Sequence, residues 1–243
     1  WYEDVRQTVE KFCEDNHIAL AASFRCQDYV DNTHPNYIGH VGVGVDPNLA
    51  KAIKESDLII SLGARLGEMT TSGYELLKPP AIRQKFVHIY PSSEELGRVY
   101  QPDIAIVASA KEFVSHLSLL NLKNTVERGG WIATLHQNYL DFSTPLKNMG
   151  DVQLAEIVAH VHDHTAENAI MTNGAGNYAI WLHRFYRYQQ YGTQLAPTSG
   201  SMGYGLPAAI SAAFEHDDKE VVCFAGDGCV MMCIQELATV AQY

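Results

Sequence analysis

Short apolar runs rich in β-branched residues alternate, in the first half of the chain, with segments long enough to form helices. The runs are Ile18 to Phe24, Asp57 to Gly63, Lys85 to Tyr90 and Ile104 to Ala108. One intervening segment, Ala110 to Leu122, has its apolar residues on a helical stripe, and another has a helix-start pattern at Asp46 to Asn48. Alternating strands and helices predict βαβ units, so we expect residues 1–122 to form a doubly wound parallel sheet.

The periodic pattern is interrupted between Lys123 and Gly150. Glycines at Gly129 and Gly130, the proline Pro145 and scattered polar residues replace it, although 131–140 has the composition of a short helix. We therefore interpret 123–150 as a linker.

A second unit is predicted from Asp151 to Tyr243. A helical pattern at its start is followed by a short strand, Ala169 to Thr172, and later by a buried strand, Glu220 to Ala225. Further helices are predicted at 208–214 and 230–240. This order indicates a second doubly wound parallel sheet. Because the chain ends where another strand would be due, we expect this unit to be incomplete.

The composition indicates a folded protein and excludes several partners. Apolar residues make up 47% of the chain, and 17 Lys and Arg against 28 Asp and Glu give a formal net charge of -11. So acidic a chain repels nucleic acid, and its apolar stretches are far shorter than the about 20 residues of a membrane helix. The five cysteines form no Cys-x-x-Cys pair, and the acidic start, Trp1 to Asp4, differs from a targeting leader. We therefore expect a cytoplasmic protein without a disulfide framework.

Glycine-rich segments carry the candidate chemistry. Two of them, Asn173 to Asn177 and Thr198 to Pro207, and the acidic turn Gly226 to Gly228 end predicted strands or open predicted helices. In a parallel sheet, such segments meet at the carboxyl edge, where ligands bind. Backbone N–H groups at a helix start bind phosphate, and a carboxylate such as Asp227 can lie near a diphosphate when Mg²⁺ bridges them. Taken alone, Gly-Asp-Gly also fits an ordinary turn, and the motif leaves that alternative open.

The order of these segments carries a specific resemblance. The stretches concerned are Asn173 to Trp181, Leu195 to Ala209, Ala225 to Cys229 and Glu236 to Thr239. Together they resemble the diphosphate-binding domain of thiamine diphosphate enzymes of the acetolactate synthase type. The stretch Asp57 to Arg65 is similar to the central domain of the same enzymes. The resemblance implies a central Rossmann-like domain followed by a partial thiamine diphosphate-binding domain.

By this resemblance, thiamine diphosphate and Mg²⁺ are the expected cofactors. Asp227 would bind the metal. The Gly200 carbonyl and the Met202 amide would bond the aminopyrimidine, and the Met202 side chain would hold the cofactor bent, which makes Gly200 and Met202 the implied catalytic positions. The positions implied to contact the cofactor are Gly176, Asn177, Tyr178, Gly200, Met202, Gly226, Asp227, Gly228 and Cys229. The family commonly has His where this chain has Tyr178.

The implied activity is decarboxylation of a 2-keto acid with carboligation, in a homo-oligomer. The sequence lacks two elements of the family: a catalytic glutamate on an N-terminal pyrimidine-binding domain, and an Asn-Asn pair beyond Gly228. We therefore interpret the chain as a truncated piece, inactive alone, whose partner is a pyrimidine-binding domain of the same or a second subunit. The alternative is a non-catalytic nucleotide-binding or interaction module derived from such an enzyme.

Some central domains of the family hold FAD. Here Arg65 is followed by Leu66 to Gly73 instead of the acidic-basic continuation of the flavin-binding synthases. Gly42-x-Gly44 is half a dinucleotide fingerprint and lacks its third glycine, so we interpret it as a loop. The sequence therefore favours a central domain without flavin.

Overall fold

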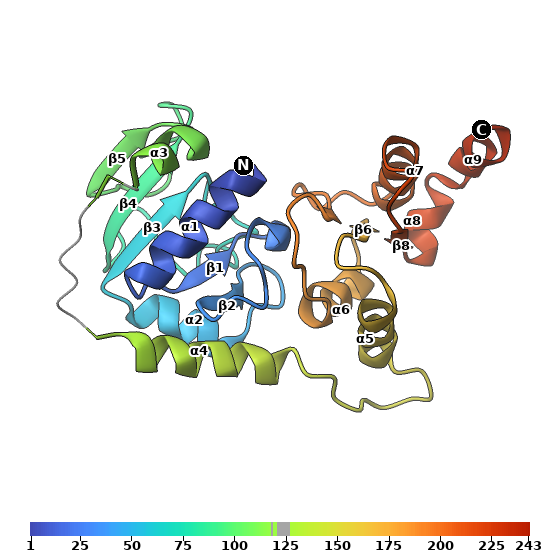
Figure 1. The fold of residues 1–243 in the computed structure, drawn as a ribbon, viewed down its shortest axis with the longest axis horizontal. Helices are drawn as coiled ribbons and strands as arrows, with labels where there is room; N and C mark the ends of the chain where they lie inside the picture. Colours follow the sequence, from blue (N-terminus) through green and yellow to red (C-terminus); the bar gives the residue numbers. More distant parts are fainter. Residues whose placement is uncertain (118, 121–126) are drawn as a thin grey trace. The chain divides into compact units, whose positions relative to one another are not determined.

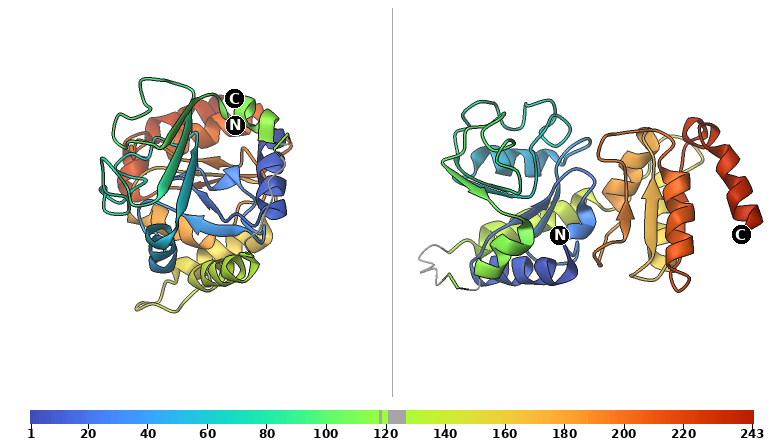
Figure 2. Two further views of the ribbon diagram at one scale, coloured as in Figure 1. Left: turned by 90° about the vertical axis from the view of Figure 1, so that its left-hand side faces the viewer. Right: turned by 90° about the horizontal axis from the view of Figure 1, so that it is seen from above.

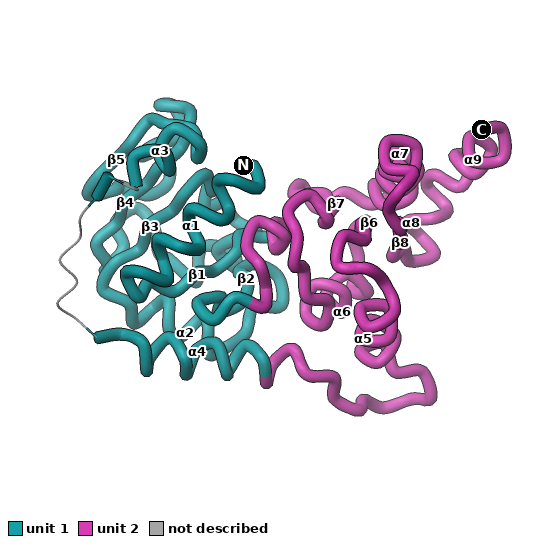
Figure 3. The backbone as a smooth tube through the Cα atoms, viewed as in Figure 1, with its two compact units in different colours: residues 1–24, 34–140 teal, residues 25–33, 141–243 magenta. Residues whose placement is uncertain are grey.

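A computed structural model describes residues 1–117, 119–120 and 127–243 of the chain. The chain forms two compact units (Figures 1 and 3): unit 1 contains Trp1–Phe24 and His34–Leu140, and unit 2 contains Arg25–Thr33 and Asp141–Tyr243. Both units are built on parallel strands, which confirms the expected α/β class. Within the described ranges, every helix falls short of the length and hydropathy that crossing a membrane requires.

The described residues of unit 1 form two parallel sheets. In the smaller one, β1 (Leu20–Ala22) pairs with β2 (Tyr37–His40), and the larger one has the order β3-β4-β5 (Figure 1). The strands of the larger sheet are β3 (Leu58–Leu62), β4 (Lys85–Tyr90) and β5 (Ile104–Val107). The helices are α1 (Glu3–Asp15), α2 (Pro47–Glu55), α3 (Ala110–Leu117) and α4 (Gly129–Phe142), whose residues up to Leu140 belong to this unit.

Helix α2 begins where the local sequence favours a helix start. The Asp46 carboxylate accepts a hydrogen bond from the Asn48 N–H at 2.8 Å, and Pro47 occupies the first turn, where a backbone N–H is not needed. On its inner face, Leu49 is buried in the same apolar cluster as Phe86 of β4. The cap and the buried face together fix this helix against the sheet.

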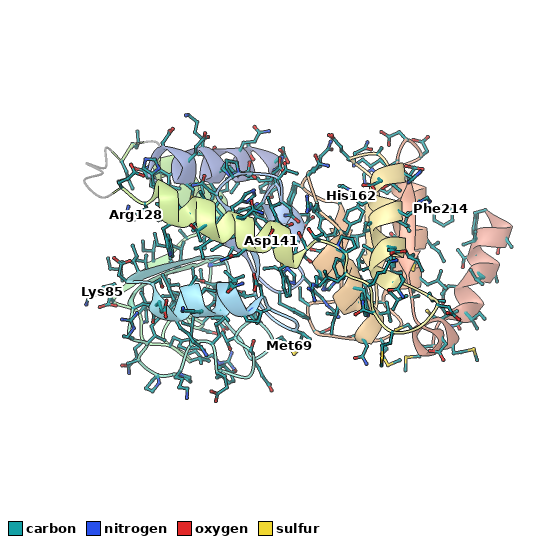
Figure 4. The ribbon with its side chains drawn as sticks, turned by 90° about the horizontal axis from the view of Figure 1, so that it is seen from below. Met69, Lys85, Arg128, Asp141, His162 and Phe214 are labelled. Atoms are coloured by element: carbon teal, nitrogen blue, oxygen red, sulfur yellow. The ribbon has the colours of Figure 1, made fainter. Side chains whose placement is uncertain are left out.

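The start of β4 is tied to the residue before β5. Asp103 accepts a hydrogen bond from the Lys85 ammonium at 2.7 Å and another from the Phe86 N–H at 2.9 Å; Figure 4 labels Lys85. The bond from the Phe86 N–H helps to fix the register in which Val87 lies opposite Ile104.

Helix α4 lies inside the segment 123–150, for which the sequence predicts a linker, and it includes the short helix expected at 131–140. Its buried residues are Ile132, Leu135 and Tyr139. Their spacing of three and four places them on one face, and the Tyr139 ring packs edge-on against Tyr37 with 4.9 Å between centroids. Residues 121–126, which include the start of the predicted linker and the end of the helix predicted at 110–122, lie outside the described residues.

Unit 2 contains a three-stranded parallel sheet in the order β7-β6-β8. Its strands are β6 (Ile170–Asn173), β7 (Gln194–Leu195) and β8 (Val221–Phe224). Its helices are α5 (Leu154–His164), α6 (Asn177–Phe185), α7 (Gly205–Glu215), α8 (Asp227–Met231) and α9 (Leu237–Gln242), with 3₁₀ turns η1 (Gln27–Tyr29) and η2 (Ile234–Glu236). Figures 1 and 2 show α7 alongside the sheet, on the face opposite α5 and α6.

Alternation along β6 explains how the helices divide between the two faces. Met171 is buried in one cluster with Val158 of α5 and Leu182 of α6. The next residue, Thr172, points to the other face, where its hydroxyl donates a hydrogen bond to the Gly205 carbonyl of α7 at 2.9 Å. Both faces of the sheet are therefore covered, as a doubly wound fold requires.

A short segment from the first half of the sequence, 25–33, belongs to unit 2. The buried carboxylate of Asp28 accepts hydrogen bonds from three successive N–H groups, those of Gly192 at 2.9 Å and of Thr193 and Gln194 at 3.2 Å. These bonds satisfy backbone donors at the start of β7. The segment is therefore attached to unit 2 by buried polar contacts that no local pattern indicates.

Candidate functional site

The carboxyl ends of β6, β7 and β8 lie at one edge of the unit 2 sheet, because the three strands are parallel. A loop follows each strand and leads into a helix. The first loop is 174–176 before α6, the second loop is 196–204 before α7, and the third loop is 225–226 before α8. The structure thus brings the two glycine segments and the acidic turn to the same edge, as the sequence predicts.

The second loop ends where α7 closely approaches the end of β6. A Cβ atom at Gly205 would lie 2.8 Å from the Asn173 carbonyl carbon and 2.8 Å from the Gly174 nitrogen, so only glycine permits this approach. The Asn173 side chain is fully buried, donates to the Gly174 carbonyl at 2.7 Å and bonds the His183 ring at 3.2 Å. The start of the first loop is therefore held both by the close approach of Gly205 and by the hydrogen bonds of the Asn173 side chain.

A tyrosine and a cysteine connect the first loop to α8. The Tyr178 hydroxyl accepts a hydrogen bond from the Gly174 N–H at 3.1 Å and donates one to Cys229 Sγ at 3.2 Å. The thiol of Cys229 in turn donates to the Ala175 carbonyl at 3.0 Å. Burial, together with the neighbouring Cys229, raises the pKa of Tyr178, so its hydroxyl keeps its proton and remains a donor.

The ring of Tyr178 fills the space beside two of the predicted glycines. A Cβ atom would lie 2.9 Å from this ring at Gly176 and 3.0 Å from it at Gly226. Gly176 has a φ of +151° and precedes Asn177, the first residue of α6, and both are exposed. The first-turn N–H groups of a helix lack intrahelical partners, so Gly176 and Asn177 lie where backbone donors are available. The Tyr178 hydroxyl, in contrast, bonds groups of the protein itself.

The second and third loops meet at Met202 and Gly228. The Met202 methyl would lie 3.0 Å from a Cβ atom at Gly228, so a larger residue there would displace the methionine side chain. Met202 keeps 46% of its surface exposed. Asp227, adjacent to Gly228, is the first residue of α8 and is exposed. The protruding methionine and the carboxylate therefore lie on neighbouring segments of the same edge.

Gly200 lies in the second loop with a φ of +77°, a left-handed conformation that glycine adopts without strain. Its N–H closes a turn by donating to the Pro197 carbonyl at 2.9 Å. A Cβ atom at Gly200 would meet nothing within 4 Å, so the backbone conformation, and not packing, favours glycine here.

Arg25 is a residue of this site that the glycine motifs do not indicate. Arg25 is 8% exposed, and its guanidinium donates to the Pro197 carbonyl at 2.6 Å. Burial lowers the pKa of Arg25, and Tyr178 and Cys229 oppose that change. The only sequence signal is the polar run Arg25 to Asp28 directly after a predicted strand, and that run has no fixed spacing to the glycine segments.

The described residues contain no group of three or more His, Cys, Asp and Glu side chains that could hold a metal ion. Within the three loops and the first residues of the helices that follow them, Asp227 is the carboxylate that the sequence offers to a cation. An exposed carboxylate is a hard oxygen ligand of the kind that Mg²⁺ takes together with water and substrate phosphates.

Two family models match the chain. The model described as "Thiamine pyrophosphate enzyme, central domain" matches residues 1–117, and "Thiamine pyrophosphate enzyme, C-terminal TPP binding domain" matches residues 174–243. The second match contains α6, α7 and α8 together with the second and third loops.

Curated relatives bear acetolactate synthase names. The chain is similar to acetolactate synthase isozyme 1 large subunit of Escherichia coli, with 30% identity over 96% of this chain and 41% of that protein. It is 34% identical to the chloroplastic acetolactate synthase 1 of Nicotiana tabacum over 78% of this chain and 29% of that protein. With the acetolactate synthase large subunit of Lactococcus lactis it shares 30% identity over 87% of this chain and 36% of that protein. The chain thus spans at most 41% of these relatives.

Proposed function

The chain belongs to the thiamine pyrophosphate enzyme family, and from that premise we propose that it forms part of an acetolactate synthase-like enzyme. The proposed enzyme depends on thiamine diphosphate and Mg²⁺ and acts on a 2-keto acid by decarboxylation with carboligation. The observation that carries the proposal is the convergence of the three loops at one sheet edge, where Met202 lies against Gly228 beside the exposed Asp227.

The residues of the edge fit the cofactor in their chemistry. Asp227 supplies a hard oxygen for Mg²⁺, with backbone groups of Gly226, Gly228 and Cys229 beside it. Gly176 and Asn177 supply the exposed start of α6, a nine-residue helix suited to an anion such as diphosphate. The open space around Gly200 allows a ring to approach its backbone.

The roles proposed for individual residues follow the resemblance to thiamine diphosphate enzymes, and their place at the sheet edge supports them. The Gly200 carbonyl is proposed to accept a hydrogen bond from the aminopyrimidine, and the Met202 amide to donate one. The exposed Met202 side chain is proposed to keep the cofactor folded. Thiamine diphosphate, when bound, supplies the electron sink that decarboxylation of a 2-keto acid needs. The chain contributes binding, orientation and shape.

Tyr178 is proposed to act indirectly. Its hydroxyl bonds Gly174 and Cys229, so it orients the first loop and the start of α8, between which the diphosphate is proposed to lie. A contact between its hydroxyl and the diphosphate would have to replace one of these bonds.

The proposed enzyme needs a pyrimidine-binding domain with a catalytic glutamate, from the same or a second subunit of a homo-oligomer. We refer to this chain together with that domain as the complete enzyme. Positioning by Gly200 and Met202 does not replace the proton transfer that the glutamate supports. We therefore propose that residues 1–243 alone are inactive and bind the cofactor weakly.

Unit 1 is proposed to work without flavin. Arg65, at the carboxyl side of β3, donates to the Tyr90 hydroxyl at 2.9 Å and lies 3.8 Å from Glu95, an acidic neighbour that disfavours an anionic dinucleotide beside this arginine. The absorption spectrum of the purified complete enzyme tests this, since bound flavin would show directly.

Calorimetry with thiamine diphosphate and Mg²⁺ tests the main proposal. We expect residues 1–243 to bind with a dissociation constant on the order of 0.1 mM or weaker, and the complete enzyme to bind more tightly and consume pyruvate or another 2-keto acid. A complete enzyme without cofactor binding would contradict the proposal and favour the alternative, a non-catalytic nucleotide-binding or interaction module. Micromolar binding by residues 1–243 would contradict the need for the second domain.

A further inference from the structure

We propose that Arg25 is a positioning residue for the second loop of the cofactor site, acting through the carbonyl oxygen of Pro197. The inference rests on the proposed function, because it concerns the loop that carries Gly200 and Met202. It adds to the site a residue from the segment 25–33, which lies outside the glycine segments and belongs to unit 2.

Two donors share the carbonyl oxygen of Pro197. The Pro197 carbonyl accepts the Arg25 guanidinium at 2.6 Å and the Gly200 N–H at 2.9 Å. The second bond closes the turn that sets the backbone of Gly200, whose φ is +77°. Because the Gly200 carbonyl is proposed to meet the aminopyrimidine, a change in the direction of the Pro197 carbonyl would be transmitted to it.

The contact is strong because it is shielded from water. Arg25 is 8% exposed, and Pro197 is buried as well. A hydrogen bond from a charged donor in such surroundings is stronger than a neutral bond at the surface. Burial lowers the pKa of Arg25, while interactions with Tyr178 and Cys229 oppose that change. Tyr178 and Cys229 are the residues that link the first loop to α8.

The backbone around Arg25 is anchored firmly enough to aim its side chain. Next along the chain, the Gln27 N–H donates to the Gln194 side chain at 2.7 Å, and the Gln27 amide donates to the His183 carbonyl at 2.7 Å. Arg25 itself has a φ of +58°, which costs free energy for a residue other than glycine and persists when the surroundings enforce it. A long side chain on such an anchored backbone can hold a loop in place.

Hydrogen exchange in the cofactor-free complete enzyme gives the first test. Arg25→Met keeps much of the side-chain length but removes every hydrogen-bond donor of the side chain. We therefore expect faster amide exchange in a peptide covering 196–204. Arg25→Lys keeps a charge and a donor and should restore part of the protection. The matched control is Arg98→Met, which changes an arginine whose side chain is 69% exposed in unit 1. Unchanged exchange in Arg25→Met would overturn the inference, whatever the fate of the proposed function.

Kinetics and circular dichroism of the cofactor-loaded enzyme give the second test. At saturating thiamine diphosphate and Mg²⁺, we expect Arg25→Met to lower kcat by about 10- to 100-fold, because a misplaced Gly200 carbonyl no longer orients the ring. The near-ultraviolet circular dichroism of the bound aminopyrimidine should change as well, and Arg25→Lys should recover part of both signals.

The results of these experiments distinguish failure of the positioning role of Arg25 from failure of the proposed function. Normal kcat and dichroism in Arg25→Met, despite faster exchange, would overturn the positioning role and leave a contact that only stabilises the fold. If the unsubstituted complete enzyme fails to bind thiamine diphosphate, the proposed function fails and the positioning role fails with it. If Arg25→Met does not fold, the same comparison is made with Arg25→Gln, whose shorter, neutral side chain replaces the guanidinium donor, and wild-type exchange and kcat in that variant would overturn the inference.

Discussion

Tyr178 and Cys229 are joined by a hydrogen bond of 3.2 Å from the tyrosine hydroxyl to the cysteine sulfur. They come from α6 and α8, so the bond connects the helices that follow β6 and β8. The same hydroxyl accepts the Gly174 N–H at 3.1 Å. One side chain thus holds two loops of the proposed diphosphate site in a fixed relation.

The first prediction concerns Tyr178→Phe. The substitution keeps the ring beside Gly176 and Gly226 but leaves the Gly174 N–H without this acceptor, so we expect a loss of about 1–2 kcal/mol in the free energy of unfolding. Urea denaturation measures it. The control is Tyr204→Phe, because Tyr204 lies in the second loop and is 39% exposed. Equal stability of Tyr178→Phe and the unsubstituted protein would show that the bond contributes nothing.

The second prediction concerns Asp227→Ala in the complete enzyme. The proposed Mg²⁺ site would then have no carboxylate beside the diphosphate, so Mg²⁺-dependent activity should be abolished. Activity is measured over a Mg²⁺ titration, with Asp217→Ala as the control because Asp217 is exposed in the turn after α7. Near-normal turnover at saturating Mg²⁺ would show that Asp227 is a turn residue only.

The strands of unit 2 that carry chemistry could be predicted from local pattern. The runs 169–172 and 220–225 lie within one residue of β6 and β8 at each end, because β-branched and apolar residues bounded by turn signals suffice to define a buried strand. The glycine segments could likewise be placed at the carboxyl edge, since parallel strands share that edge. The order of the strands along the chain and the sheet edge at which their loops lie can therefore both be predicted from the sequence pattern.

Other elements depend on contacts between distant residues. The strand β7 has only two residues, Gln194 and Leu195, and its start is bonded by Asp28, so no periodic signal could reveal it. The continuous helix expected at 230–240 is instead divided into α8, η2 and α9. The sequence pattern does not reveal Arg25 either, because its partner Pro197 is distant in sequence.

The third prediction concerns the pH dependence of stability. Burial raises the pKa of Asp28 from 3.8 to about 6, and its bonds from Gln194, Gly192 and Thr193 offset only part of that effect. The folded state therefore binds the proton more tightly than the unfolded state. The resulting stabilisation is fully present below pH 3.8 and is lost as the pH rises through about 6.

Between about pH 5 and about pH 7.5, the free energy of unfolding should consequently fall by about 1 kcal/mol from this group alone. Asp28→Asn, which cannot ionise, should remove that part of the slope, whereas Asp217→Asn at an exposed turn should not. Urea denaturation at several pH values gives the comparison. A slope that Asp28→Asn leaves unchanged would mean that the three backbone donors fully compensate the buried charge.

The fourth prediction concerns Met202→Ala in the complete enzyme. Met202 protrudes from the second loop with 46% of its surface exposed and its methyl group against Gly228, so truncation removes shape without removing a charge or a hydrogen bond. If the side chain acts by keeping the cofactor folded, its loss should chiefly lower kcat, since diphosphate and Mg²⁺ provide most of the binding. Met202→Leu retains most of the bulk and should lose less.

Steady-state kinetics with thiamine diphosphate titrated to saturation separates the two roles of Met202. If Met202 only packs the second loop against Gly228, its truncation would weaken cofactor binding, and excess cofactor would restore the rate of Met202→Ala. A residue that enriches the folded cofactor changes the bound complex itself, so the rate stays low at any cofactor concentration. Full recovery by excess thiamine diphosphate would therefore refute the wedge role and leave Met202 as a packing residue.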